Sequence, residues 1–198
     1  MAEVAWREDR AAQLVEFAVA LPLLVLFVVG IFDFSNAFTF KQKLTNIARD
    51  AARAAAADPA NDLQAPSTSV PVSVVDAFQV IDHYFLTSNI NDCGITLSSS
   101  PTGMMWTSTA NGNGCLPAGL TIIINRGYYF SAGTAVQPAN ANCQGTLSGG
   151  PTQIVVIGTC VSIRYAYEWR FGKVASLLGR TAALPNTITV ASVAMNEN

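Results

Sequence analysis

The residues in this sequence with the clearest potential for chemistry are four cysteines, which could form disulfides or bind a metal ion. They are Cys93, Cys115, Cys143 and Cys160, and no two of them form a C-x-x-C pair. The only histidine is His83, which leaves too few ligands at usable spacing for a zinc site. An even number of cysteines without metal-ligand spacing favours disulfides over free buried thiols, and disulfides persist in oxidising compartments. We therefore expect the cysteine-bearing part of the chain to lie outside the cytoplasm.

Four thiols permit three pairings. Cys93 and Cys115 bracket a polar loop, while Cys143 lies in the Gly- and Ser-containing approach to the strand that carries Cys160. The alternation of that strand places Cys160 on the face away from its apolar stripe, where a crossing loop can reach it. We favour the pairs Cys93–Cys115 and Cys143–Cys160, and the other two pairings stay open.

The rest of the sequence offers no catalytic constellation. It has no phosphate-cradling Gly loop, no nucleophile elbow and no His–carboxylate pair at a supporting spacing. His83 falls off the apolar face of its expected helix, so we interpret it as a surface or cap residue. Glu168 and Arg170 alternate on the solvated side of a strand and are interpreted as solvated. The sequence predicts neither an enzyme nor a bound cofactor or metal ion.

Charged residues are sparse and unevenly placed. They make up 12% of the chain, against a typical share of about 25%, and the net charge is −2. Nucleic-acid binding needs clustered Lys and Arg, so the composition argues against such a partner. Between Leu63 and Cys160 the charged residues are Asp76, Asp82, Asp92 and Arg126.

The longest apolar run extends from Leu14 to Phe34. Its roughly 21 residues, at about 1.5 Å rise each, form a helix of about 31 Å, which matches a hydrocarbon core of about 30 Å. Only Glu16 and Asp33 interrupt the run, one near each end, where a carboxylate can reach the interface. The run predicts one membrane-spanning helix over residues 14–34.

The residues on either side of the apolar run leave open its orientation in the membrane and the possibility that it is a signal peptide. Basic residues lie on both sides of the span, so the positive-inside rule does not decide its orientation. We place the C-terminal part outside the cytoplasm because of its cysteines. Ser35–Ala37 resembles a signal-peptidase site, but the apolar core of a signal peptide has about 7–15 residues and this run is longer.

The helix is expected to continue beyond the span to about Ala57, where Asp58 and Pro59 end the pattern. The first half of a helix over residues 12–57 is then apolar all round, and its second half is amphipathic. Small and apolar residues recur there at helical spacing. They are Ala37, Phe40, Leu44, Ile47, Ala48, Ala51 and Ala55.

A long N-terminal helix, half in the membrane and half packed on a globular domain, is the plan of pilins. The stretch Arg10–Ala18, RAAQLVEFA, resembles the prepilin-peptidase site of TadE-like pseudopilins, the minor pilins of tight-adherence pili. That family has a basic residue, a small residue before the cut, four residues and then Glu-Phe. The resemblance places the cut between Ala11 and Ala12, so that residues 1–11 are a leader. The family usually has Gly where this chain has Ala11.

Further blocks at both ends of the chain are similar to the same family, whereas the middle, about Leu63 to Pro151, has no such match. The similar blocks are Leu21–Leu24, Gly30–Phe34, Asn46–Ala54, Val161–Trp169 and Ala191–Met195.

The resemblance implies a role in assembly for Glu16. A carboxylate next to Phe17 in lipid is costly unless it is paired. In pilins, the corresponding glutamate is thought to meet the free α-amino group of a neighbouring subunit, which would neutralise two charges and set the axial register. The structural alternative is a glutamate in the first helical turn, which the helix dipole favours.

The remainder predicts a small α+β domain over residues 72–198, after a linker over residues 58–71. Alternation in its longest strand argues for an antiparallel sheet with one wet face. The apolar face of that sheet is expected to pack on the long helix, which makes the fold pilin-like with disulfide-stapled loops. We expect a helix at Val72–Phe85 and strands at Ile95–Leu97, Leu120–Asn125, Ile154–Phe171 and Thr187–Met195.

One loop, Ser98–Gly114, carries the apolar residues Met104, Met105 and Trp106 among Thr, Ser, Asn and Gly. An apolar tip of this kind can contact another subunit or a host surface. It can equally be a plug that tucks into the domain. The sequence favours neither.

Together these features predict a TadE-like minor pilin, a structural component of a tight-adherence, type IV-like pilus that serves surface adhesion and biofilm formation. Its partners would be other pilins through the N-terminal helix, the prepilin peptidase, an inner-membrane assembly platform and the membrane. The protein would be a single-pass inner-membrane protein before assembly and would lie at the cell surface afterwards. The alternative is a Sec-secreted or membrane-tethered binding module outside any pilus.

Overall fold

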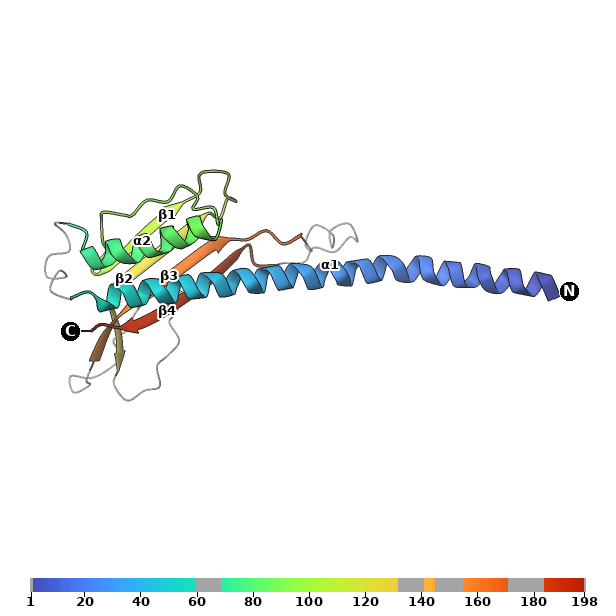
Figure 1. Ribbon diagram of the computed structural model, residues 1–198, viewed down its shortest axis with the longest axis horizontal. Helices are drawn as coiled ribbons and strands as arrows, with labels where there is room; N and C mark the ends of the chain where they lie inside the picture. Colours follow the sequence, from blue (N-terminus) through green and yellow to red (C-terminus); the bar gives the residue numbers. More distant parts are fainter. Residues whose placement is uncertain (1, 60–68, 132–140, 145–154, 171–183, 198) are drawn as a thin grey trace. The chain divides into compact units, whose positions relative to one another are not determined.

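The computed structural model describes residues 2–59, 69–131, 141–144, 155–170 and 184–197. Within these residues, two long helices and four strands follow one another in sequence (Figure 1). The chain divides into two compact units, one of Met1–Thr39 with Trp169–Pro185 and the other of Phe40–Glu168 with Asn186–Asn198. The fold is α+β, as expected from the sequence.

The N-terminal helix, α1, covers Ala2–Ala57 and runs through Pro22 without interruption. It ends directly before Asp58 and Pro59, where proline was expected to stop it. The second helix, α2, covers Val72–Thr87 and starts after Pro71. Most of the expected linker between the two helices lies outside the described residues.

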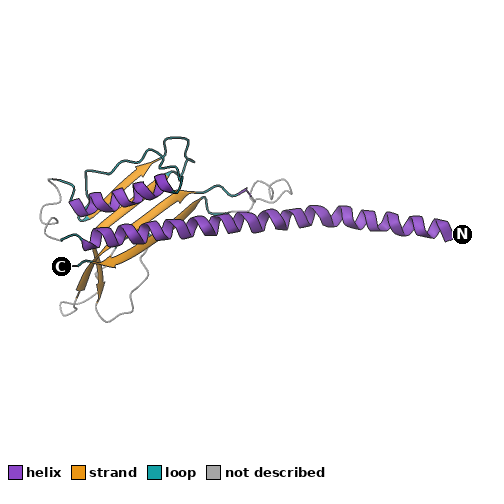
Figure 2. Cartoon of the chain, in the orientation of Figure 1, coloured by secondary structure: helices purple, strands orange, loops and turns teal. Residues whose placement is uncertain are grey.

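The four strands form one antiparallel sheet in the order β1-β2-β3-β4. Their bounds are Met105–Ala110 for β1, Leu120–Ser131 for β2, Val155–Ala166 for β3 and Thr187–Met195 for β4. Strands that are neighbours in the sheet are also neighbours in sequence, so the sheet is a simple meander in which each strand pairs with the next (Figure 2).

The core lies between one face of the sheet and the two helices. Phe40 of α1 and Phe85 of α2 both contact the ring of Tyr165 in β3, at centroid distances of 5.2 and 6.2 Å. Side chains of alternate positions on the strands are buried on this face, as period-2 patterning requires. They include Trp106, Leu120, Ile122, Ile124, Val161, Ile163, Ile188 and Val190.

A β-bulge interrupts β2 at Arg126 and Gly127, which together oppose the single residue Thr159 on β3. The extra residue shifts the alternation of the strand by one position. Arg126 still follows the period of Ile122 and Ile124 and points to the face that α1 covers, whereas Tyr128, after the bulge, is buried on the opposite face beside Cys160.

Several expected strand bounds are wrong. β3 ends at Ala166 and not at Phe171, because its ladder with β4 stops at the pair Ala166–Thr187. Ile95–Leu97 forms no strand, although Ile95 is buried. The edge position is instead taken by β1, which lies within the segment expected to be a loop.

Candidate assembly helix and its attachment to the globular domain

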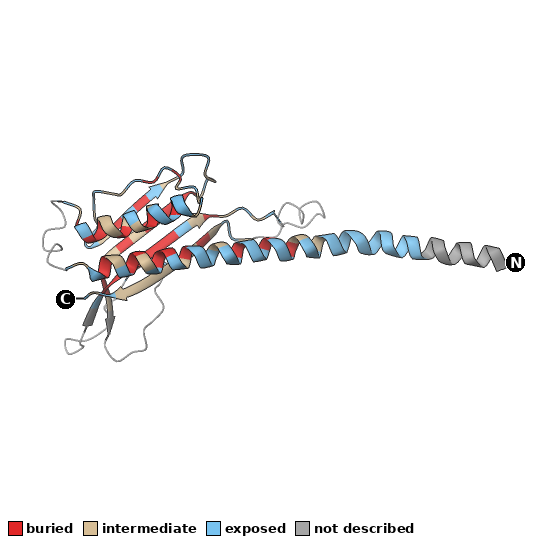
Figure 3. Ribbon diagram, viewed as in Figure 1, coloured by how far each residue is buried: buried red, intermediate tan, exposed pale blue. Residues whose placement is uncertain are grey.

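The N-terminal half of α1 exposes its apolar side chains on all sides. Leu14, Phe17 and Ile31 are 69%, 63% and 68% exposed, and Figure 3 shows this part of the helix as a continuous exposed surface. An apolar surface of this extent in water would be strongly unfavourable. It is stable only when lipid or other helices surround it.

The same segment is long and apolar enough to cross a membrane. The most apolar stretch of the helix over Gln13–Ala57 is almost entirely exposed. A core helix of a soluble domain would bury most of such a stretch. The helix therefore fits a single-pass anchor.

The residues expected to control maturation and register lie in this half of α1. Ala11 and Ala12 fall within the helix, at positions where only the backbone is described. Glu16 is exposed, and its neighbours Phe17 and Val19 are exposed as well. The carboxylate thus stands on an apolar surface and is accessible to a group from another molecule.

The C-terminal half of α1 has the opposite character. It buries a stripe of small and apolar residues against the sheet, visible as the alternating buried bands in Figure 3. Alanines in this stripe allow the helix axis to approach the strands closely. The buried residues of the stripe are Leu44, Ile47, Ala48, Ala51, Ala52, Ala55 and Ala56. The amphipathic half predicted from the sequence is therefore present.

Arg126 fastens the end of α1 to the sheet. Its side chain is completely buried, and its Nη1 donates hydrogen bonds to the carbonyl of Ala55 and to Thr159 Oγ1, the latter at 2.7 Å. The same guanidinium donates to Asn196 Oδ1 at 3.0 Å and to the Asp58 carbonyl at 3.2 Å. Carbonyls in the last turn of a helix lack intrahelical donors, and a cation there also interacts favourably with the helix dipole.

The C-terminal segment completes this attachment. The backbone N–H of Glu197 donates to the carbonyl of Ala56 at 2.9 Å, next to the carbonyl that Arg126 binds. Asn196 in turn donates to the Arg126 carbonyl at 3.3 Å. The last turn of α1, the bulge of β2 and the end of the chain are thus one hydrogen-bonded unit. In the sequence, Arg126 stands out only as one of few charged residues in its region, and this role was not predicted.

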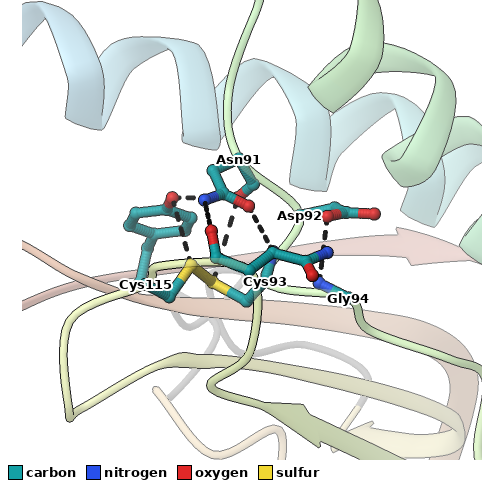
Figure 4. Close-up of a disulfide and its surroundings, with 7 residues drawn as sticks. Asn91, Asp92, Cys93, Gly94 and Cys115 are labelled. Carbon is teal, nitrogen blue, oxygen red and sulfur yellow. Dashed lines mark hydrogen bonds between the residues drawn. A yellow bond between two sulfur atoms is a disulfide. The ribbon is translucent and has the colours of Figure 1, made fainter.

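The disulfide Cys93–Cys115 closes the segment between α2 and β2, with 5.4 Å between its Cα atoms. Figure 4 shows it among Asn91, Asp92 and Gly94, which form a tight hydrogen-bonded turn. Asn91 Oδ1 accepts from the Cys93 N–H, and Asp92 Oδ1 accepts from the Gly94 N–H, both at 2.9 Å.

The second disulfide, Cys143–Cys160, joins the opposite face of the sheet to a crossing segment, with 5.5 Å between Cα atoms. Both cysteines are fully buried. Residues 141–144 lie over β2 and β3, since Asn125 Nδ2 donates to the Cys143 carbonyl at 2.7 Å and Ser162 donates to the carbonyl of Ala141. Both pairs are the ones favoured from the sequence.

The apolar residues Met104, Met105 and Trp106, for which the sequence left a contact surface and a plug equally open, are not a free apolar tip. Met105 and Trp106 belong to β1, and Trp106 is 1% exposed within the core. Met104 is 38% exposed and packs over Gly127, whose missing side chain leaves room for it. The contact-surface interpretation is therefore wrong for Trp106, which is part of the core.

The exposed face of α2 carries the only histidine. A shallow groove of about 390 Å³ lies along α2 beside α1, and its lining residues are Ala54, Asp76, Gln79, Val80, His83 and Tyr84. His83 is exposed, as expected. Among the residues that the structure describes, no group of three His, Cys, Asp or Glu side chains could hold a metal ion.

Two tyrosines on this side have perturbed acidity. Tyr84 donates to Asp50 Oδ2 at 2.8 Å, and this hydrogen bond to a carboxylate raises the pKa of its phenol. Burial, together with the negative charge of Asp92, raises the pKa of Tyr165, which donates to the Asn91 carbonyl at 2.9 Å. Each contact joins two elements: Tyr84 links α2 to α1, and Tyr165 links β3 to the segment that follows α2.

An exposed apolar half-helix that continues into a half packed on an antiparallel sheet fits a single-pass membrane anchor and the pilin-like plan expected from the sequence. Residues 11–53 match the model of one family, described as TadE-like protein. The match begins at the expected processing site and ends within the packed half of α1. The resemblance to TadE-like pseudopilins is thereby confirmed over this segment. No curated protein and no solved structure matches the chain significantly.

Proposed function

We propose that this protein is a minor pilin of a tight-adherence, type IV-like pilus, and that it acts by assembly and performs no catalysis. The observation that carries the proposal is the division of α1 into an exposed apolar half and a packed half, within a segment that matches the TadE-like family. Such a helix can lie in a membrane before assembly and in a bundle of similar helices afterwards, since both surround it with apolar groups.

In this proposal a prepilin peptidase cuts between Ala11 and Ala12, which creates a new α-amino group on Ala12 and makes Glu16 the fifth residue of the mature chain. The exposed Glu16 carboxylate pairs with the α-amino group of a neighbouring subunit in the helix bundle. Because an unpaired charge in an apolar medium is costly, this pairing favours one axial register over others. The globular domain lies outside the cytoplasm, where its two disulfides are stable.

The mature N-terminus tests the proposal. Co-expression with the cognate prepilin peptidase should shorten the chain by residues 1–11, and the intact mass should correspond to a chain that begins at Ala12. Ala11→Lys should block the cut, because a long charged side chain replaces the small residue before it. Ala2→Lys, a substitution of the same kind away from the cut, should be processed normally.

Two other outcomes would overturn the proposal. A mature chain that begins near Phe38 would indicate a Sec signal and a secreted binding module. A chain that keeps its full mass with the peptidase present would indicate a permanent anchor that no pilin pathway matures.

A further inference from the structure

Trp169 lies against α1 at the end of its apolar half. The ring centroids of Trp169 and Phe34 are 5.2 Å apart, with 56° between the ring planes. Trp169 stands three residues after the end of β3, so the connection between β3 and β4 meets the helix at this point. Its Nε1 donates to the carbonyl of Pro185 at 2.6 Å, which joins the two ends of that connection.

Phe34 is located at the boundary of the apolar segment. From Leu14 to Phe34 the helix rises about 31 Å, close to the thickness of a bilayer hydrocarbon core. Polar residues, beginning with Ser35 and Asn36, follow directly. When the segment spans a bilayer, Phe34 therefore lies where the acyl chains meet the headgroups.

We infer that Trp169, held against Phe34, is an interfacial anchor whose partner is the phospholipid layer at the headgroup–acyl boundary. Tryptophan favours this boundary because its ring is large and apolar while its N–H is polar. Here the N–H is already bonded to Pro185, so the ring can lie on the apolar side without an unsatisfied donor.

Two exposed charged residues, Glu168 and Arg170, flank Trp169 in the sequence. Of these, Arg170 suits the same partner, because it can extend its guanidinium to lipid phosphates. Asp33, the acidic residue at this level of the helix, is only 3% exposed and so presents little negative charge to the headgroups. The anchor fixes the depth of α1 in the bilayer at Phe34, the C-terminal end of the membrane-spanning segment.

The inference rests on the part of the proposed function that places α1 across a membrane, and it is independent of pilus assembly.

To test it, the full chain is reconstituted into vesicles of phosphatidylcholine and phosphatidylglycerol. All variants also carry Trp6→Phe, which removes the emission of the tryptophan before the span. Nitroxide labels are carried on the lipid acyl chain, either near the carbonyl or near the chain end. Tryptophan emission is compared with and without Trp169→Phe, which keeps an aromatic ring against Phe34.

The shallow label should remove more emission than the deep label, and this lipid-quenched component should disappear with Trp169→Phe. The emission that remains then comes from Trp106, which is 1% exposed in the sheet core and should be insensitive to both labels. Emission that neither label reduces, or that the deep label reduces more, would contradict an interfacial position for Trp169.

A control separates failure of the anchor from failure of the span. Phe27 is 61% exposed in the middle of the apolar segment, and Phe27→Trp in the Trp169→Phe background should be quenched mainly by the deep label. Deep quenching there without quenching of Trp169 would refute the anchor and leave the span intact. No quenching at either position would refute the span and the proposed function together.

Discussion

The guanidinium of Arg126 donates a hydrogen bond to the carbonyl of Ala55 in the last turn of α1. This contact links a strand of the sheet to the helix that we propose for pilus assembly. The side chain makes the contact without exposure to water.

The first prediction concerns the stability of this unit. Arg126→Met keeps much of the side-chain volume but removes the donor to Thr159 Oγ1 and to the carbonyls of Ala55 and Asp58, while Asn196 Oδ1 keeps its hydrogen bond from Thr159. Loss of charged hydrogen bonds in a buried site should lower the free energy of unfolding by about 2–4 kcal/mol. Urea titration of the full chain in detergent micelles, followed by circular dichroism, measures the change.

Arg164→Met is the matched control for that experiment. Arg164 is exposed on β3, and its Nη2 donates to Thr121 Oγ1 at 3.2 Å. A surface contact of this kind contributes little, so the cost should stay below about 0.5 kcal/mol. Equal unfolding midpoints for the two variants would show that the buried hydrogen bonds of Arg126 contribute no more to stability than the exposed contact of Arg164.

The role of Arg126 is an example of a contact that local sequence patterns do not predict. Leu120, Ile122 and Ile124 alternate toward the core, and simple continuation of that period places Arg126 on the same face. The predicted strand ended at Asn125, because a charged residue at a core position contradicts the apolar pattern. Only the position of the helix end, which no local pattern contains, shows that a donor is needed there.

In the strands, the alternation of buried residues was predicted from the sequence, but the positions of some strands and strand ends were not. The alternation of β3 was predicted correctly because a half-buried strand imposes period 2 on its own residues. The end of β3 was predicted incorrectly, because Tyr167 and Trp169 continue the alternation after pairing with β4 has stopped at Ala166. β1 was expected to be a loop because half of its six residues are Thr or Ser, although Trp106 was compatible with a core position.

The second prediction concerns the two disulfides, which close loops with sequence separations of 22 and 17 residues. Each should stabilise the folded domain by about 3 kcal/mol through the lost entropy of the unfolded chain. Replacing Cys93 and Cys115 together by Ala, or Cys143 and Cys160 together, should lower the free energy of unfolding by similar amounts. A non-reducing peptide map of the native protein checks the pairing, and a Cys115–Cys160 peptide would contradict it.

The third prediction concerns the order in which the disulfides are reduced. Cys143 and Cys160 are both fully buried, whereas Cys115 is partly exposed. A thiol reagent must reach a sulfur atom to react, so mild reductant should open Cys93–Cys115 first. Timed alkylation followed by mass spectrometry gives the order. Simultaneous opening would mean that reduction proceeds through global unfolding.

The fourth prediction concerns alkaline pH. Burial, with Asp92 nearby, raises the pKa of Tyr165 above its ordinary value of about 10. The folded state therefore favours the neutral phenol, and its stability contribution is fully present below the unfolded pKa. That contribution is lost as pH rises through the higher folded pKa. Stability of the native chain should fall in this window.

Tyr165→Phe tests this dependence. It removes the hydrogen bond to the Asn91 carbonyl and should cost about 1 kcal/mol at neutral pH. The variant should also show a smaller loss of stability above pH about 10 than the native chain. Tyr84→Phe serves as the comparison, because Tyr84 is more exposed and its bond to Asp50 lies in solvent. Identical alkaline profiles for native protein and Tyr165→Phe would exclude Tyr165 as the responsible group.

The last prediction concerns Glu16. Glu16→Gln keeps the size and polarity of the side chain but removes the charge that would pair with a neighbour's α-amino group. Membrane insertion should persist, since a neutral amide is easier to place near lipid than a carboxylate. Incorporation into pili should fall strongly, because the amine in the bundle would lose its counter-charge and the subunits their preferred register.

Sheared pilus fractions and membrane fractions, probed for the same protein, measure both effects in one experiment. Glu168→Gln is the control, because Glu168 is also exposed and lies outside the apolar helix. It should leave the pilus fraction unchanged. If Glu16→Gln is incorporated as well as the native chain while the Ala11→Lys precursor is excluded, maturation matters for assembly but the Glu16 charge does not. Glu16 would then be a helix-start residue that the dipole of α1 favours.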